Sequence, residues 1–443
     1  MKPLIRIFIV VTVATVLPAG GICDLLAAGR RASGVPVARD LGTGSLAWET
    51  SRAPSVAVSA NGTVYVVWPG KGRLGAPRAE GIAMLPEECT FGGGDSKWSG
   101  VPGISVRRRG RWSAPGLLVE GRVDCDMLHA WCDGEALHLL VVAERVNKCN
   151  HLVLDPKTGK WRVKARLPFA PSQYCARCSV GKSVHIACSE GQYVHYLSFD
   201  GAAWSRPLRI EKSRNTSGCV TRVRMAVDRR RVAHLMWWSA GTGEHGTHGY
   251  AAVSKGQTVA EAVKFEKSPI EQGEMNLGFV PEGRLFVAYK ARVPRTHPGA
   301  DKIHIRYRKN GKWTKPQLLD AGPGRMHGHI YTAWNANGVF VSWLAGESYG
   351  VGGGLASSSV RRCSTMRGGV WSKSKWLARH DRGILGRISG EQTPVSPVSS
   401  GICLDGRGYV HMAWGTPGCF HAVVGDLSGD KSKTTTPPGD SSR

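Results

Sequence analysis

The sequence lacks a long apolar run, and it is poor in acidic side chains. Its one apolar run near the N-terminus, Ile7–Leu17, is too short to cross a bilayer, and no later segment is long and apolar enough to do so. We therefore expect no membrane span. No linker-like composition separates the repeated segments described below, so the sequence marks no second domain within them.

The shortage of acid gives the chain a strong positive charge, with 59 basic residues against 33 acidic ones and a net charge of +26. One interpretation is a solvated basic surface that keeps the protein soluble. The other is attraction to an anionic polymer, such as a sulfated or uronic polysaccharide. Nucleic acid would respond to the same field, but no recognised nucleic-acid motif accompanies the charge, so we expect no nucleic-acid partner.

The N-terminus has the composition of a secretory signal, because Lys2 and Arg6 precede the short apolar run and small residues follow it. We assign residues 1–28 to a signal peptide and expect a secreted or periplasmic protein. Cys23 offers the alternative of a lipid anchor, for which Ile22 is a poor match. At the other end, residues 428–443 are rich in Ser, Thr, Pro and Gly, which predicts a disordered polar tail.

The stretch Lys302–Ala345 shows the unit from which the rest is built. Apolar and polar residues alternate with period two on either side of Lys309–Lys312 and again on either side of Asn335–Gly338. Alternation between Asn-Gly turns is a strong hairpin signal, so the unit predicts four short antiparallel strands.

The unit recurs, which decides the fold class. Its inner hairpin appears seven times, at Pro54–Trp68, Met127–Ala143, Cys175–Cys188, Val220–Trp238, Met275–Tyr289, Ile330–Trp343 and Gly401–Trp414. A strand of the form Trp-x-x-Pro-x-x-Leu or a variant of it recurs as well. These repeats predict an all-β, seven-bladed β-propeller of four-stranded antiparallel blades over residues 35–427. We expect Val35–Leu41 to supply the fourth strand of the last blade and so to close the ring; a β-sandwich array is the alternative.

The sequence has twelve cysteines, of which eleven remain if Cys23 leaves with the signal peptide. In an oxidising compartment they predict disulfides, although the connectivity cannot be deduced from sequence. The pair Cys175-Ala176-Arg177-Cys178 also matches half of a zinc or redox motif. No cofactor is required by any motif, and a structural divalent metal is an open alternative, with His245 and His248 as weak candidate ligands.

In a propeller, the loops that join second to third strands and those that lead into each first strand share one face around the central channel. Residues distant in sequence can form a polar cleft there. Acidic residues, histidine and arginine gather in the predicted loops. As substrate-binding candidates we select Glu144, Glu190, Arg325, His329 and Glu347.

The repeats resemble those of BNR-repeat, sialidase-like propellers over Val35–Leu427, with Lys309–Trp313 as a degenerate relative of the Asp-box. The second blade resembles that of ulvan-lyase-like propellers more closely. Its His129, the turn Asp133–His138, His151 and the later Tyr174 follow the order of that family's motif.

The resemblance to lyases implies β-elimination on an anionic polysaccharide. His129 or His151 would be the base, Tyr174 a candidate acid, and Arg222 or Arg224 the group that neutralises the carboxylate. Whether the protein is an enzyme is left open: it would be a polysaccharide lyase or a sialidase-like glycoside hydrolase. The alternative is a non-catalytic envelope propeller that binds glycans or a protein partner. We expect a monomer in either case.

Overall fold

The computed structural model describes most of the repeated part of the chain. The described residues are 39–40, 54–69, 77–89, 101–120, 123, 125, 127–143, 147–168, 175–190, 193–210, 220–239, 247–254, 257–263, 270–291, 302–320, 325–326, 330–346, 359–378, 400–415 and 419–428. The proposed signal peptide, 1–28, and most of the proposed tail, 428–443, lie outside them.

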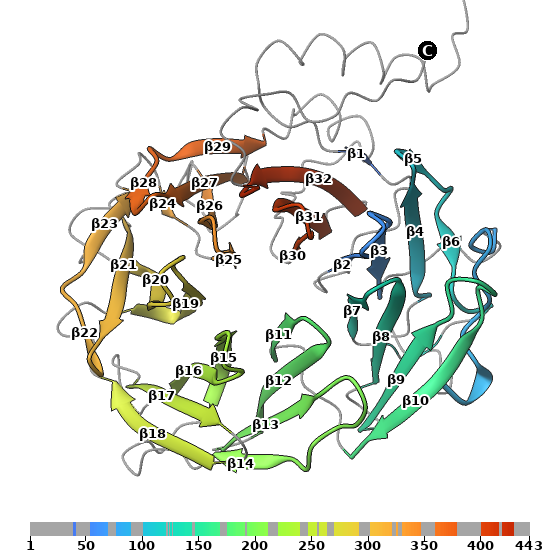
Figure 1. The fold of residues 1–443 in the computed structure, drawn as a ribbon, viewed down its shortest axis with the longest axis horizontal. Coiled ribbons are helices and arrows are strands. Elements are labelled where there is room, and N and C mark those ends of the chain that lie inside the picture. The colour runs from blue at the N-terminus through green and yellow to red at the C-terminus, as the bar shows by residue number, and fades with distance from the viewer. Residues whose placement is uncertain are drawn as a thin grey trace, which may run out of the picture.

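Seven antiparallel sheets stand around one axis, as the repeats predict (Figure 1). Blade 1 consists of β2 (Ser55–Val58), β3 (Val64–Trp68), β4 (Gly103–Arg108), β5 (Arg111–Trp112) and β6 (Gly116–Leu117). Blade 2 consists of β7 (Met127–Asp133), β8 (Ala136–Ala143), β9 (Lys148–Leu154) and β10 (Trp161–Leu167). Blade 3 consists of β11 (Ala176–Val180), β12 (Ser183–Glu190), β13 (Tyr193–Phe199) and β14 (Leu208–Ile210).

The remaining blades repeat this order. Blade 4 consists of β15 (Val220–Val227), β16 (Ala233–Ser239), β17 (Thr247–Ser254) and β18 (Gln257–Val263). Blade 5 consists of β19 (Ile270–Phe279), β20 (Leu285–Ala291), β21 (Lys302–Lys309), β22 (Lys312–Trp313) and β23 (Gln317–Asp320). Blade 6 consists of β24 (Arg325–Met326), β25 (Tyr331–Trp334), β26 (Val339–Gly346), β27 (Ser359–Arg367), β28 (Val370–Trp371) and β29 (Lys375–Ala378).

Blade 7 joins the two ends of the chain. It consists of β30 (Ser400–Leu404), β31 (Tyr409–Gly415), β32 (Cys419–Asp426) and β1 (Arg39–Asp40). Within the predicted closing strand Val35–Leu41, the described residues are Arg39 and Asp40, which pair with His421 and Phe420 of β32. One short 3-10 helix, η2 (Glu87–Cys89), interrupts the strands, and the described residues contain no helix that could span a membrane.

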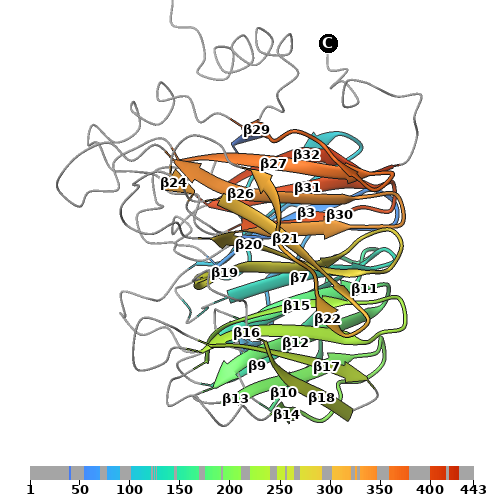
Figure 2. The same ribbon diagram turned by 90° about the vertical axis from the view of Figure 1, so that its left-hand side faces the viewer.

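The tight hairpin turns of all blades lie on one face of the ring, which we call the hairpin-turn face (Figure 2). Both the turn between the first and second strands and the turn between the third and fourth strands point that way, because successive strands of a blade are antiparallel. The described hairpin connections on this face are short turns.

A repeated aromatic ring explains how the blades pack. The same register position of each second strand carries an aromatic side chain: Tyr65, His138, His185, His234, Phe286, Phe340 and His411. The facing residue on the first strand is small or a cysteine in six blades, and Trp131 is the exception in blade 2. In blade 5 it is Gly278, where an added Cβ would come within 2.6 Å of Phe286. His138, the last residue of the turn Asp133–His138, is therefore a packing residue, and so are the histidines at the same register position in other blades.

Alternation along the first strand of each blade divides its side chains between two neighbours. On β7, Leu128 and Ala130 pack toward blade 1, whereas Met127 and Trp131 pack toward blade 3. On β11, Cys175, just before the strand, packs toward blade 2, whereas Ala176 and Cys178 pack toward blade 4. This is the period-two rule applied to a ring, in which both faces of a blade are buried.

The cysteines depart from our prediction. No disulfide joins any two of the nine cysteines whose side chains the structure describes. Their burial raises the thiol pKa, to about 11 for Cys178 and Cys363 and to about 12 for Cys403, so these thiols behave as small apolar side chains.

Candidate functional site

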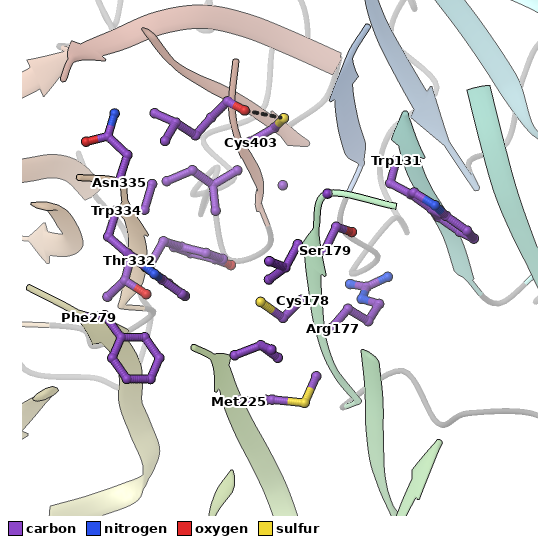
Figure 3. Close-up of a pocket in the computed structure, with 18 of the residues that line it drawn as sticks. Trp131, Arg177, Cys178, Ser179, Met225, Phe279, Thr332, Trp334, Asn335 and Cys403 are labelled. Carbon is purple, nitrogen blue, oxygen red and sulfur yellow. Dashed lines mark hydrogen bonds between the residues drawn. The ribbon is translucent and has the colours of Figure 1, made fainter. Parts of the chain in front are cut away.

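A cavity of about 2020 Å³ runs along the axis of the ring (Figure 3). Its walls come from the first strands of all seven blades: β2, β7, β11, β15, β19, β25 and β30. It extends to the hairpin-turn face, where the turns at Gly134, Lys182, Arg229, Glu282 and Gly406 line it. A cavity of this size exceeds the roughly 300–1,000 Å³ of most small-molecule sites, so it has room for an oligomer.

Carboxylates at this end of the cavity interact with residues of the hairpin turns. Asp228 Oδ1 accepts the backbone N–H of Arg230 and of Val232, both at 2.8 Å. Asp405 Oδ1 likewise accepts from Arg407 and Tyr409, at 2.9 and 2.8 Å, and Asp133 lies 3.9 Å from the Lys182 ammonium. The hairpins hold these acidic side chains in place beside the basic residues around them.

Exposed basic side chains surround the axis on the hairpin-turn face. Every blade contributes at least one from its turns: Arg108, Arg109, Arg111, Lys157, Lys160, Lys182, Arg229, Arg230, Arg231, Lys309, Lys312, Arg367 and Arg407. The sequence placed much of the charge on turns, and the structure gathers those turns on one face.

His129, the first candidate base, lies on β7 and lines the cavity. Its Nε2 atom is buried and has no hydrogen-bond partner within the part of the chain that the structure describes. Burial, with the nearby Arg177 cation adding to it, holds the pKa of His129 well below its ordinary value. The imidazole is therefore neutral at pH 7.

His151, the second candidate base, does not line the cavity. It lies on the third strand, β9, with 0% of its surface exposed. Its Nδ1 accepts a hydrogen bond from the indole N–H of Trp204 at 3.1 Å, and its Nε2 lies 2.9 Å from Nδ1 of His138. Both ring nitrogens are therefore engaged inside blades 2 and 3, and Trp131 stacks between His151 and His129.

Of the two candidate arginines, Arg224 lines the cavity from β15. Its Nε donates to the carbonyl oxygen of Met275 at 2.9 Å and its Nη1 to that of Val223 at 3.0 Å. Arg224 thus also links blade 4 to blade 5. Arg222 is placed by its backbone alone, opposite Trp238 on β16.

The other predicted site residues are placed in part or not at all. The backbone of Glu190 pairs with Tyr193, and that of Arg325 pairs with Gly346. Tyr174, Glu144, His329, Glu347 and His245 lie outside the described residues. His248 is buried on β17, where burial lowers its pKa to about 4, and the described residues contain no group of three or more side chains suited to a metal ion.

The structure adds two residues that sequence reasoning did not select for this site, Arg177 and Trp131. Arg177 extends from β11 toward the side on which Trp131 lies (Figure 3). Strand alternation could have found this pair: Met127, His129 and Trp131 share one side of β7, and Cys175 and Arg177 share the facing side of the next blade's first strand.

Comparisons with known proteins give distant likenesses of fold. No family model matches the chain, so the resemblance to BNR-repeat and ulvan-lyase-like propellers stays a prediction. No curated protein matches it either. Among solved structures, hydrazine synthase of Kuenenia stuttgartiensis is 13% identical, with 84% of this chain and 96% of that chain covered and a TM-score of 0.43.

Two carbohydrate-active enzymes are also among the similar structures. The α-L-arabinofuranosidase of Fusarium graminearum is 8% identical, with 75% of this chain and 97% of that chain covered and a TM-score of 0.43. The α-L-arabinanase of Penicillium chrysogenum is 12% identical, with 66% and 90% covered and a TM-score of 0.37. At this degree of similarity, none of their functions is carried over to this chain.

Proposed function

We propose that this propeller binds an acidic polysaccharide on its hairpin-turn face, at the opening of the axial cavity. The observation that supports this most is that each of the seven blades adds an exposed Lys or Arg to that face. A surplus of positive charge around a concave opening raises the local concentration of an anionic ligand. Export, which the N-terminal sequence predicts, would bring such a surface to extracellular or envelope polysaccharides.

The surroundings of the two candidate bases favour binding without catalysis. Elimination at a uronate needs a base, an acid and a cation around one sugar ring. His129 faces the cavity, but His151 is enclosed by Trp131, Trp204 and His138. The proposed role of His151 as a base therefore has no support from its surroundings.

A second candidate function is β-elimination with His129 as the sole base. The observation in its favour is that His129 is a neutral imidazole on the cavity wall, with an Nε2 that no described residue engages. Tyr174 would protonate the leaving oxygen, and Arg222 or Arg224 would neutralise the carboxylate. Incubation with acidic polysaccharides, followed by an assay for new unsaturated ends, tests this function. A product that is lost in His129→Ala supports elimination. If the wild type forms no product, elimination is refuted and the binding proposal stands without it.

Charge reversal on the hairpin-turn face tests the binding proposal. Lys182→Glu, Arg229→Glu and Arg230→Glu combined should weaken binding of a polyuronate at least roughly tenfold at low salt. The matched control reverses Arg162, Arg166 and Arg209, which are exposed on the outermost strands β10 and β14. Equal losses in both triple variants would mean that net charge alone, and not this face, attracts the polymer.

A further inference from the structure

Three buried side-chain nitrogen atoms at the boundary between blades 2 and 3 have no hydrogen-bond partner within the described chain. They are Nε2 of His129, Nε1 of Trp131 and Nη1 of Arg177. All three residues line the axial cavity. Buried polar atoms in folded proteins are nearly always hydrogen-bonded, so three such atoms in one place require an explanation.

The three residues are neighbours. His129 and Trp131 are stacked, with ring centroids 5.6 Å apart and an interplanar angle of 26°. Arg177 is close enough to His129 to act on its charge state. The Cys175 thiol lies 3.7 Å from the Met127 sulfur. This contact joins the same two blades, two residues before His129 and Arg177. The niche is therefore formed by alternate residues of β7 and by the facing residues at and before β11.

Other blade boundaries show what a purely structural link looks like. Ser55 Oγ accepts the backbone N–H of Ala130 at 2.9 Å, between blades 1 and 2. Asn276 donates to Ile330 and Arg224 to Met275, at 3.0 and 2.9 Å, across the boundaries of blade 5. In each case a side chain on a first strand bonds the backbone of the neighbouring blade. Nη1 of Arg177 occupies a similar boundary and bonds nothing that the structure describes.

We propose that His129, Trp131 and Arg177 form a binding niche for a carboxylate of the ligand. A guanidinium presents paired N–H donors that match the two oxygens of a carboxylate, and the indole can only donate. With His129 protonated on Nε2, all three groups donate, which suits an anion and does not suit a cation. This inference deepens the proposed function, on which it rests, by naming uronate as the sugar class and these side chains as its specificity determinants.

Binding of the monosaccharide D-glucuronate to the full chain tests the niche apart from the basic face. Calorimetry should detect glucuronate binding, and glucose, which lacks the carboxylate, should not bind. Arg177→Gln should weaken glucuronate binding roughly tenfold or more, because a charge-assisted pair becomes neutral. Arg177→Lys, which keeps the charge and loses the fork, should fall in between. Arg209→Gln, the same change on the outermost strand of the same blade, should leave the affinity unchanged.

A spectroscopic readout separates the niche from a structural role of the same residues. In the wild-type protein, glucuronate should shift the indole N–H resonance of Trp131, identified by its absence in Trp131→Phe. If glucuronate does not bind, or binds equally well to Arg177→Gln, the inference is wrong. Polyuronate binding that persists without glucuronate binding refutes the niche alone, whereas the loss of both refutes the proposed function too.

Discussion

Trp204 on blade 3 donates its indole N–H to Nδ1 of His151 on blade 2, across 3.1 Å. The ring of His151 is also in edge contact with that of Phe199, with centroids 4.9 Å apart. This one hydrogen bond joins two blades and fixes the ring of a histidine that the sequence had suggested as a catalytic base.

Trp204→Phe should therefore destabilise the fold without affecting ligand binding. The substitution keeps an aromatic ring but leaves a buried acceptor on His151 unsatisfied, which costs about 1–3 kcal/mol of unfolding free energy. Chemical denaturation measures the loss, and polyuronate affinity is the control. Unchanged stability together with lost affinity would show that His151 works in the binding site after all.

The pH dependence of stability should carry the signature of buried neutral histidines. Burial, with Arg231 adding to it, lowers the pKa of His185 from 6.5 to about 4, and burial lowers that of His248 similarly. Below pH 6.5 these histidines bind protons in the unfolded chain but not in the folded chain. The unfolding free energy therefore falls as the pH drops from about 6.5 to about 4.

His185→Phe tests this assignment, because Phe286 and Phe340 already occupy the equivalent position in blades 5 and 6. The variant should lose about 2–3 kcal/mol of the difference in unfolding free energy between neutral pH and pH ~4.5. Part of the slope should remain, since other buried histidines titrate too. A curve parallel to that of the wild type would contradict the assignment.

Gly278→Ala should destabilise blade 5 by overpacking. An added Cβ would lie 2.6 Å from the ring of Phe286, which is fully buried and cannot move away. We expect a loss of about 1–3 kcal/mol in unfolding free energy. Gly406→Ala is the matched control, because its Cβ would meet no atom within 4 Å. Equal stabilities of the two variants would mean that the ring of Phe286 has room to shift.

The sequence predicted the blades because burial on both sides of a blade imposes an alternation that is visible without coordinates. All seven inner hairpins were found in this way. The fourth strand of blade 4, Gln257–Val263, was not, because it lacks the Trp-x-x-Pro-x-x-Leu pattern of the others. It nevertheless pairs antiparallel with β17.

The site was predictable only in part. His129 and Arg224 were selected from sequence and line the cavity, whereas His151 was selected on the same grounds and lies two strands further from the axis. The sequence pattern shows that a histidine lies in a strand. Its surroundings depend on which aromatic side chain of the next blade packs against it, and the pattern does not show this. Arg177 was not predicted, because in the sequence it stands inside Cys175-Ala176-Arg177-Cys178, which matches half of a zinc or redox motif.

The most direct measurement is a binding isotherm of the full chain with a polyuronate and with a neutral glucan of similar length, at low and at high salt. We predict that the polyuronate binds, that its affinity falls steeply as salt screens the basic face, and that the glucan does not bind. Equal binding of the two polymers, or a stronger preference for single-stranded nucleic acid, would contradict the proposed function.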